Sequence, residues 1–122
     1  MRDTIKNHSD FLTGPNDPSA TTSLFFVHAK LAKIPGDARY GLVVTKRTFK
    51  FAVHRNRAKR LLRDWIAHSQ ELMAPEYDYV FIARPAILDA TREQGRAEMI
   101  KALEHITRKY VLKHRKSLQE NS

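Results

Sequence analysis

The sequence of 122 residues contains no cysteine. Disulfide bonds, thiolate catalysis and cysteine-ligated zinc are therefore excluded, and a reducing compartment suits the chain. The first ten residues, MRDTIKNHSD, lack the apolar core of a secretory signal. The longest apolar runs, LFFV and VFIA, fall far short of the roughly 20 residues that span a bilayer. We therefore expect a cytoplasmic protein.

Acidic residues are missing from one segment, residues 46–63, which carries eight Lys and Arg side chains. The residues before it have five basic and four acidic side chains, and those after it have nine of each, so this segment supplies +8 of the net charge of +9. Such uncompensated charge is typical of a surface that faces a polyanion. Nucleic acid is therefore the leading candidate partner.

The length and a hydrophobic fraction of 42% indicate one folded domain over residues 1–122. The predicted strands are 24–29, 40–45 and 77–83, and the predicted helices are 1–13, 52–72 and 89–113. The first two strands are expected to pair as a hairpin, and the third, nearly continuous in apolar character, to lie centrally in the sheet. A frayed tail is expected from about residue 115 to residue 122. This order predicts an α+β sandwich of a small sheet and helices.

A helix over the basic segment has two opposite faces when it advances about 100° per residue. The cationic side holds Arg55, Asn56, Lys59, Arg60 and Arg63, and the apolar side holds Ala58, Leu61, Leu62, Trp65 and Leu72. Arg57 falls off the cationic stripe, beside the core, and Lys46, Arg47 and Lys50 extend the patch before the helix. Guanidinium groups bind phosphate oxygens in a fork and stay charged at every working pH. Trp65 on the apolar side argues against a helix lying on a membrane.

The same residues allow other interpretations. A solvated helix face normally mixes charges of both signs, which this face does not do before Asp64. The acidic residues, including Asp78, show no metal-nuclease pattern and are expected to be solvated. Phe49 and Phe51 suit core anchoring and RNA stacking equally well. A general structured-RNA-binding protein and a DNA-binding regulator remain alternative functions, the second disfavoured because a strand precedes the basic helix.

Residues 52–63, AVHRNRAKRLLR, resemble the signature helix of the bacterial ribonuclease P protein subunit, A-V-x-R-N-R-x-K-R-x-x-R. The blocks GLVVTKR at 41–47 and DYVFIAR at 78–84 are similar to two strands of that family, and Asp10-Phe11 matches its first helix. The resemblance covers most of the chain. It implies an α-β-β-β-α-β-α order with a left-handed β-α-β crossover around the basic helix.

The resemblance also implies a role. The chain would be the accessory subunit of an endoribonuclease, a hydrolase that removes the 5′ leader of precursor tRNA. A catalytic RNA would carry out the hydrolysis with Mg²⁺ held mainly by that RNA, so no residue of this chain is expected to be catalytic. The implied partners are the ribonuclease P RNA and the leader, with no membrane and no obligate protein partner.

Specific contacts are implied by the matched positions. RNA contacts are expected from Arg55, Asn56, Arg57, Lys59, Arg60 and Arg63, with Lys46 and Arg47 beside them. Stacking on leader bases is expected from Phe11 and from His28, which stands at a strand position where the family often has an aromatic residue. Tyr110 is a looser candidate. The loop at 48–51 is one residue longer than in many members, and Gly14-Pro15 shortens the first helix.

Overall fold

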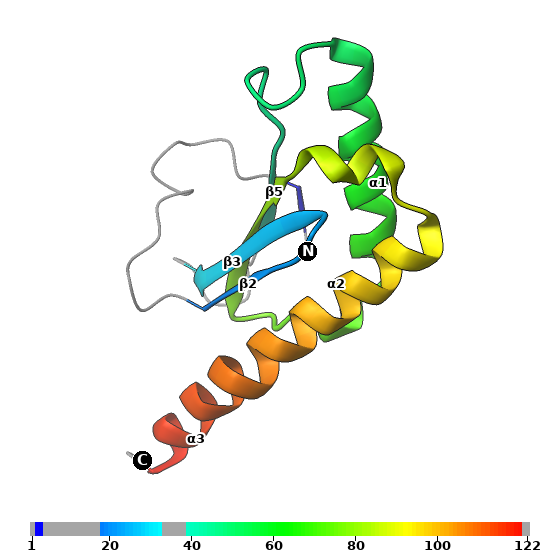
Figure 1. Ribbon diagram of the computed structural model, residues 1–122. Coiled ribbons are helices and arrows are strands. Elements are labelled where there is room, and N and C mark those ends of the chain that lie inside the picture. Colours follow the sequence, from blue (N-terminus) through cyan, green and yellow to red (C-terminus); the bar gives the residue numbers. More distant parts are fainter. Residues whose placement is uncertain (1, 4–17, 33–38, 121–122) are drawn as a thin grey trace.

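The computed structural model describes residues 2–3, 18–32 and 39–120 (Figure 1). Within these residues, five strands form one sheet in the order β1-β4-β5-β3-β2. The strands are β1 (Arg2–Asp3), β2 (Ser19–Thr21), β3 (Phe25–Leu31), β4 (Arg39–Val43) and β5 (Tyr77–Ala83). β4 runs parallel to β1 and β5, whereas β3 runs antiparallel to β5 and β2. The sheet is therefore mixed, with β5 at its centre as predicted.

The predicted hairpin between the first two strands is wrong. β5 lies between β3 and β4 and pairs with β3 along its whole length, from Phe25 opposite Ala83 to Leu31 opposite Tyr77. The most apolar strand takes the central place because it can be buried on both faces. β2 was not predicted, since three residues give too short a pattern to detect. Of the helix predicted at 1–13, only 2–3 are described, as β1; the rest lies outside the described residues.

The described residues contain three α-helices, one between β4 and β5 and two after β5. α1 spans Ala52–His68, α2 spans Arg92–Ile106 and α3 spans Leu112–Glu120. Short 3₁₀ turns occupy Gln70–Leu72 and Pro85–Asp89, and a π-helical turn, Thr107–Val111, joins α2 to α3. α1 begins where predicted, and β4, α1 and β5 form a parallel β-α-β unit. The helical structure continues past residue 115, the predicted start of a frayed tail, to Glu120.

α1 and α2 cover one face of the sheet, and the core lies between them and the strands. Alternate residues of β3 and β5, such as Val27, Tyr79 and Phe81, point into it, as the two-residue period of a strand requires. From α1, Leu62 and Trp65 are both 0% exposed. Among the residues that the structure describes, no helix has the length and apolar character needed to cross a bilayer.

Candidate nucleic-acid interface

The cationic side of α1 faces away from the core. Asn56, Arg57, Arg60 and Arg63 are exposed and Arg55 and Lys59 are half-buried, whereas Ala58, Leu62, Trp65 and Ile66 are buried. The two-faced helix is therefore confirmed. Arg57 is the exception, since it was expected beside the core. Leu61 is only half-buried and Leu72 lies beyond the helix, whereas Ile66 is buried. The buried face is therefore rotated away from Arg57 and towards Arg55 relative to the prediction.

The loop before α1 is folded back on the helix. Phe49 is 3% exposed, and its amide donates to the carbonyl of Thr45 at 2.9 Å. Arg55 Nη1 donates to the carbonyl oxygens of Phe49 at 2.9 Å and Lys50 at 3.1 Å. Phe49 is therefore a core anchor. Arg55, expected as an RNA contact, is used at least in part to shape the loop.

The remaining loop residues extend the cationic surface. Lys46, Arg47 and Lys50 are exposed, and Lys50 Nζ lies 5.9 Å from the centre of the Phe51 ring. Phe51 is 58% exposed, so its ring is open to stacking by a base. It also stands at the N-terminus of α1, where no side chain caps the helix and the first turn has no acidic residue. The amides of His54 and Arg55 donate to the carbonyl of Phe51. An anion at this end would therefore be bound by the amides of Ala52 and Val53.

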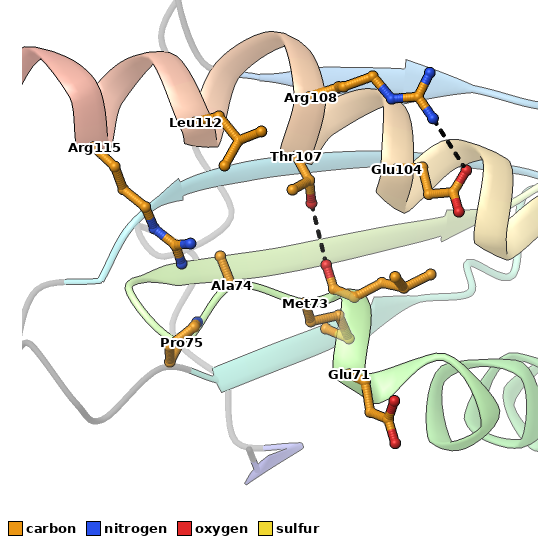
Figure 2. Close-up of a pocket in the computed structure, with 10 residues that line it drawn as sticks. Glu71, Met73, Ala74, Pro75, Glu104, Thr107, Arg108, Leu112 and Arg115 are labelled. Carbon is orange, nitrogen blue, oxygen red and sulfur yellow. Dashed lines mark hydrogen bonds and ion pairs between the residues drawn. The ribbon is translucent and has the colours of Figure 1, made fainter.

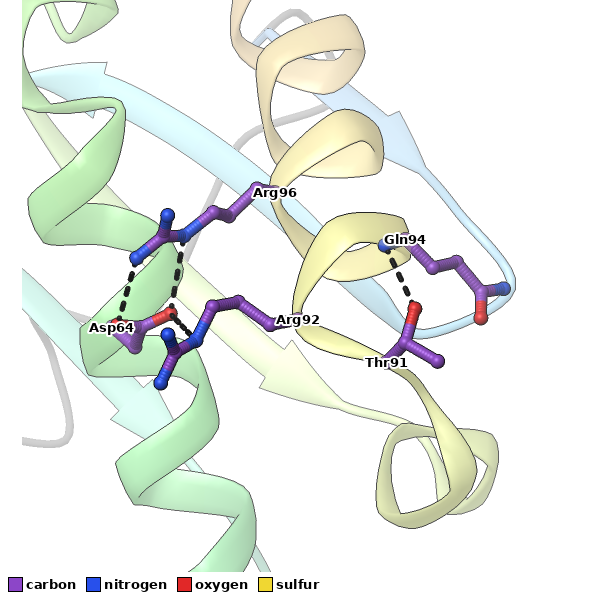
Figure 3. Close-up of polar contacts among 5 residues, drawn as sticks. All are labelled: Asp64, Thr91, Arg92, Gln94 and Arg96. Atoms are coloured by element: carbon purple, nitrogen blue, oxygen red, sulfur yellow. Dashed lines mark hydrogen bonds and ion pairs between the residues drawn. The ribbon is translucent and has the colours of Figure 1, made fainter.

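Two arginines of α2, Arg92 and Arg96, extend the cationic surface beyond α1, and both lie beside the carboxylate of Asp64 (Figure 3). Asp64, the only acidic residue of α1, accepts from Arg96 Nη2 at 3.3 Å and from Arg96 Nε at 3.4 Å, and Arg92 Nε lies 4.0 Å away. The two guanidinium groups and the one carboxylate together have a net charge of +1, so the surface stays positive here. Arg92 is 72% exposed. Sequence reasoning missed both arginines because only the packing of α2 on α1 brings them to the basic segment.

The candidates for base stacking are not gathered in one place by the described residues. Phe11 lies outside them. His28 is 6% exposed on β3, beside the half-buried Phe26, with ring centres 5.7 Å apart. Both point to the sheet face opposite the helices, because Val27 between them is in the core. Tyr110 belongs to the π-helical turn on the helical side. Phe26 was missed, although the alternation in LFFVHA places it on the same face as His28.

The expectation that the carboxylates are solvated is wrong for Asp78. This residue is 1% exposed, and it accepts from the amide of Arg39 at 2.8 Å and from Arg39 Nη2 at 3.4 Å. Its burial follows from the central position of β5. Within the described ranges, no group of three His, Asp or Glu side chains gathers in a way that could hold a metal ion.

The fold and this surface define a class of small α+β protein with one helix face suited to a polyanion. Comparison with known proteins makes the class specific. The Ribonuclease P family model matches residues 2–107. A ribonuclease P protein component of Lactobacillus delbrueckii subsp. bulgaricus is 33% identical over 100 residues, 81% of this chain and 83% of the relative. That of Halalkalibacterium halodurans is 35% identical over 96 residues, 78% of this chain and 80% of the relative. The chain therefore belongs to the ribonuclease P protein family.

Solved structures agree with this assignment. The RNase P protein of Staphylococcus aureus superposes with a TM-score of 0.62 at 27% identity, covering 88% of this chain and 92% of that one. The RNase P protein of Thermotoga maritima, at 20% identity and a TM-score of 0.58, covers 70% of this chain and 82% of its own, and shares the fold. The predicted α+β fold and the predicted role as a ribonuclease P protein subunit are therefore confirmed.

Proposed function

We propose that this chain binds the ribonuclease P RNA and the 5′ leader of precursor tRNA, and so promotes endonucleolytic removal of the leader. The observation that carries the proposal is the exposed cationic side of α1 with its loop, where the single acidic residue is already engaged by Arg92 and Arg96. In this proposal Mg²⁺ held mainly by the RNA supplies the hydrolytic chemistry. The chain supplies affinity and position.

The individual side chains suit different parts of RNA. Arg57, Arg60 and Arg63 are exposed and bear guanidinium groups that bind phosphate in a fork. Asn56 both donates and accepts, so it suits a ribose hydroxyl or a base edge. Phe51 offers an exposed aromatic face within the same surface. On the other face of the sheet, we assign the half-buried ring of Phe26 to the leader, with the buried ring of His28 beside it at 5.7 Å.

Reconstitution tests the proposal directly. Cleavage of precursor tRNA by a bacterial ribonuclease P RNA is measured at low Mg²⁺ with and without the chain, and a strong rise is expected. A triple variant, Arg57→Gln, Arg60→Gln and Arg63→Gln, should lose most of that rise. The matched control, called the charge control below, is Gln70→Glu, Ala86→Glu and Gln94→Glu, which makes the same change in net charge at three exposed positions. It should stimulate like the wild type. No stimulation by the wild-type chain would contradict the proposal.

Salt dependence tests the contact surface. If about four to six phosphates are neutralised, log K falls against log salt with a slope of about −3 to −5. Arg60→Ala should make this slope shallower by about one unit. An unchanged slope would place Arg60 outside the interface.

A competition titration separates this function from general binding of structured RNA. Precursor tRNA with its leader and mature tRNA compete for the reconstituted complex, and the precursor is expected to bind more tightly. Equal affinities would favour a general RNA-binding protein. Tight binding to duplex DNA in a gel shift would favour the DNA-binding alternative.

A further inference from the structure

The C-terminal part of the chain carries a second group of cations. Residues 107–119 include five Lys and Arg and no Asp or Glu. Two of the five are engaged: Arg115 with Glu76, and Arg108 with Glu104 at 3.7 Å. The other three are Lys109, Lys113 and Lys116, all exposed. Among the described residues the structure pairs none of these three ammonium groups with a carboxylate.

These three lysines share one side of the helix. Their spacing of i, i+4 and i+7 places them within about 60° of one another around the axis. Lys101 and His105, both exposed, continue the series backwards at intervals of four residues. We call these five residues the lysine row. At about 1.5 Å per residue the row extends over roughly 22 Å.

The row is mounted on a helix that is fixed to the body of the protein. Val111 lies on the opposite side of the helix from Lys109 and is 0% exposed. Arg115 Nε and Nη2 each lie 2.6 Å from a carboxylate oxygen of Glu76. Thr107 Oγ1 donates to the carbonyl of Leu72 at 3.2 Å, as Figure 2 shows. The helix that bears the row is therefore held in one orientation before any partner binds, which lowers the entropic cost of binding.

An aromatic side chain adjoins the row. Tyr110 is half-buried, with Lys109 Nζ 5.9 Å from the centre of its ring and the ring of His105 at 6.3 Å. It belongs to the π-helical turn, a distortion that often marks functional sites. Cations with an interleaved aromatic ring are the usual composition of a surface that binds single-stranded nucleic acid.

We propose that the lysine row is a second binding surface for the ribose-phosphate backbone of RNA, separate from α1. The choice of RNA as the polyanion rests on the proposed function. α1 meets α2 near Arg96, whereas the row begins at Lys101 and runs away from α1 along the helix, whose end projects beyond the sheet (Figure 1). One chain would thereby bridge two separate RNA segments.

The test uses the full chain with Lys109→Gln, Lys113→Gln and Lys116→Gln. Its affinity is measured by fluorescence anisotropy from about 50 to 300 mM salt, in separate arms for the ribonuclease P RNA and for precursor tRNA. In the arm whose RNA uses the row, Kd should rise about tenfold near physiological salt, and the salt slope should become shallower by about two to three units. The charge control should keep the wild-type slope. The arm that responds identifies which RNA lies on the row.

Further variants keep the inference falsifiable. A triple Lys→Arg variant at the same positions should bind like the wild type, since it retains the charge, and failure to do so would overturn the inference. The inference would also be overturned if the triple Lys→Gln variant had the same salt slope as the charge control for both RNAs. If Arg60→Ala still weakens binding in that case, the proposed function stands and only the row is excluded. If the wild-type chain binds neither RNA, both proposals fail.

Discussion

Gly95 of α2 lies directly against the indole ring of Trp65 of α1. A Cβ atom built on Gly95 would stand 1.9 Å from Cε2 and 2.1 Å from Cζ2 of that ring, far inside van der Waals contact. Trp65 is 0% exposed, so its ring has no free space into which it can retreat. This contact seats α1 on α2 and so keeps the cationic side of α1 outward.

Gly95→Ala should therefore destabilise the protein. Alanine normally stabilises a helix by about 1 kcal/mol relative to glycine, but here overpacking should lower the free energy of unfolding by about 1–3 kcal/mol. Urea denaturation measures the change. In a Trp65→Phe background, where the ring is smaller, the same substitution should cost less. Equal costs in both backgrounds would show that the ring is not the obstacle.

Arg55 and Arg60 are expected to behave differently although they are five residues apart on one helix. Arg55→Lys keeps the charge but loses the paired donation from Nη1 to the carbonyls of Phe49 and Lys50. It should lower the free energy of unfolding by about 1–2 kcal/mol. Arg60→Lys, at an exposed position, should leave stability within about 0.5 kcal/mol of the wild type. Thermal melts of the two variants test this, and equal melting temperatures would contradict the structural role of Arg55.

The sequence predicts well what depends on neighbouring residues. The start of α1 at Ala52, its two faces and the central position of β5 all follow from local periodicity and apolar content. The pairing partner of β3 does not follow from local pattern. Strands that are adjacent in the sequence usually pair, and only the assembly of the whole sheet places β5 between β3 and β4. Local sequence patterns therefore predict these elements more reliably than the order of the strands in the sheet.

The same limit applies to the candidate site. The exposed arginines of α1 are evident from the helical wheel, yet the use of Arg55 in the loop depends on where the carbonyls of Phe49 and Lys50 fall. Arg92 and Arg96 join the surface only through packing of α2 on α1. The net charge of residues 64–122 is zero, because acidic residues elsewhere in this part of the sequence balance the lysines, so net charge does not reveal the lysine row. Among the described residues, however, no carboxylate is paired with Lys109, Lys113 or Lys116.

Tyr79 makes stability depend on pH in the alkaline range. Its hydroxyl accepts from the amide of Ala74 at 2.9 Å, and burial raises the pKa of Tyr79 from its usual 10 to about 12. Folding then favours the neutral phenol, so this contribution is complete below pH 10 and is lost as the pH rises towards 12. The loss should amount to about 2–3 kcal/mol.

Tyr79→Phe isolates this effect. At pH 8 the variant should be less stable by about 1–3 kcal/mol, because the buried amide of Ala74 loses its acceptor. Between pH 10 and pH 12 the difference should shrink, since only the wild type has a phenol to ionise at this site. Urea denaturation of both proteins across this range measures the difference. A difference that stays constant with pH would contradict the raised pKa.

The carboxylate of Asp64 links α1 to α2, but its negative charge should weaken the binding of RNA to this surface. Its carboxylate holds Arg96 at 3.3 Å and lies 4.0 Å from Arg92, so Asp64→Asn removes the only negative charge on α1 and frees two guanidinium groups. Affinity for the ribonuclease P RNA should rise about threefold at low salt, because the local potential becomes more positive. The gain should vanish at high salt, where surface charges are screened.

The matched control for this variant is Asp89→Asn, which makes the same change in net charge at an exposed position of the Pro85–Asp89 turn. Stability of the Asp64→Asn protein should fall by no more than about 1 kcal/mol, since the ion pairs are partly exposed. If both variants gain affinity equally, the effect is one of total charge. A gain confined to Asp64→Asn places the RNA across the junction of α1 and α2, where Arg92 and Arg96 meet the cationic side of α1.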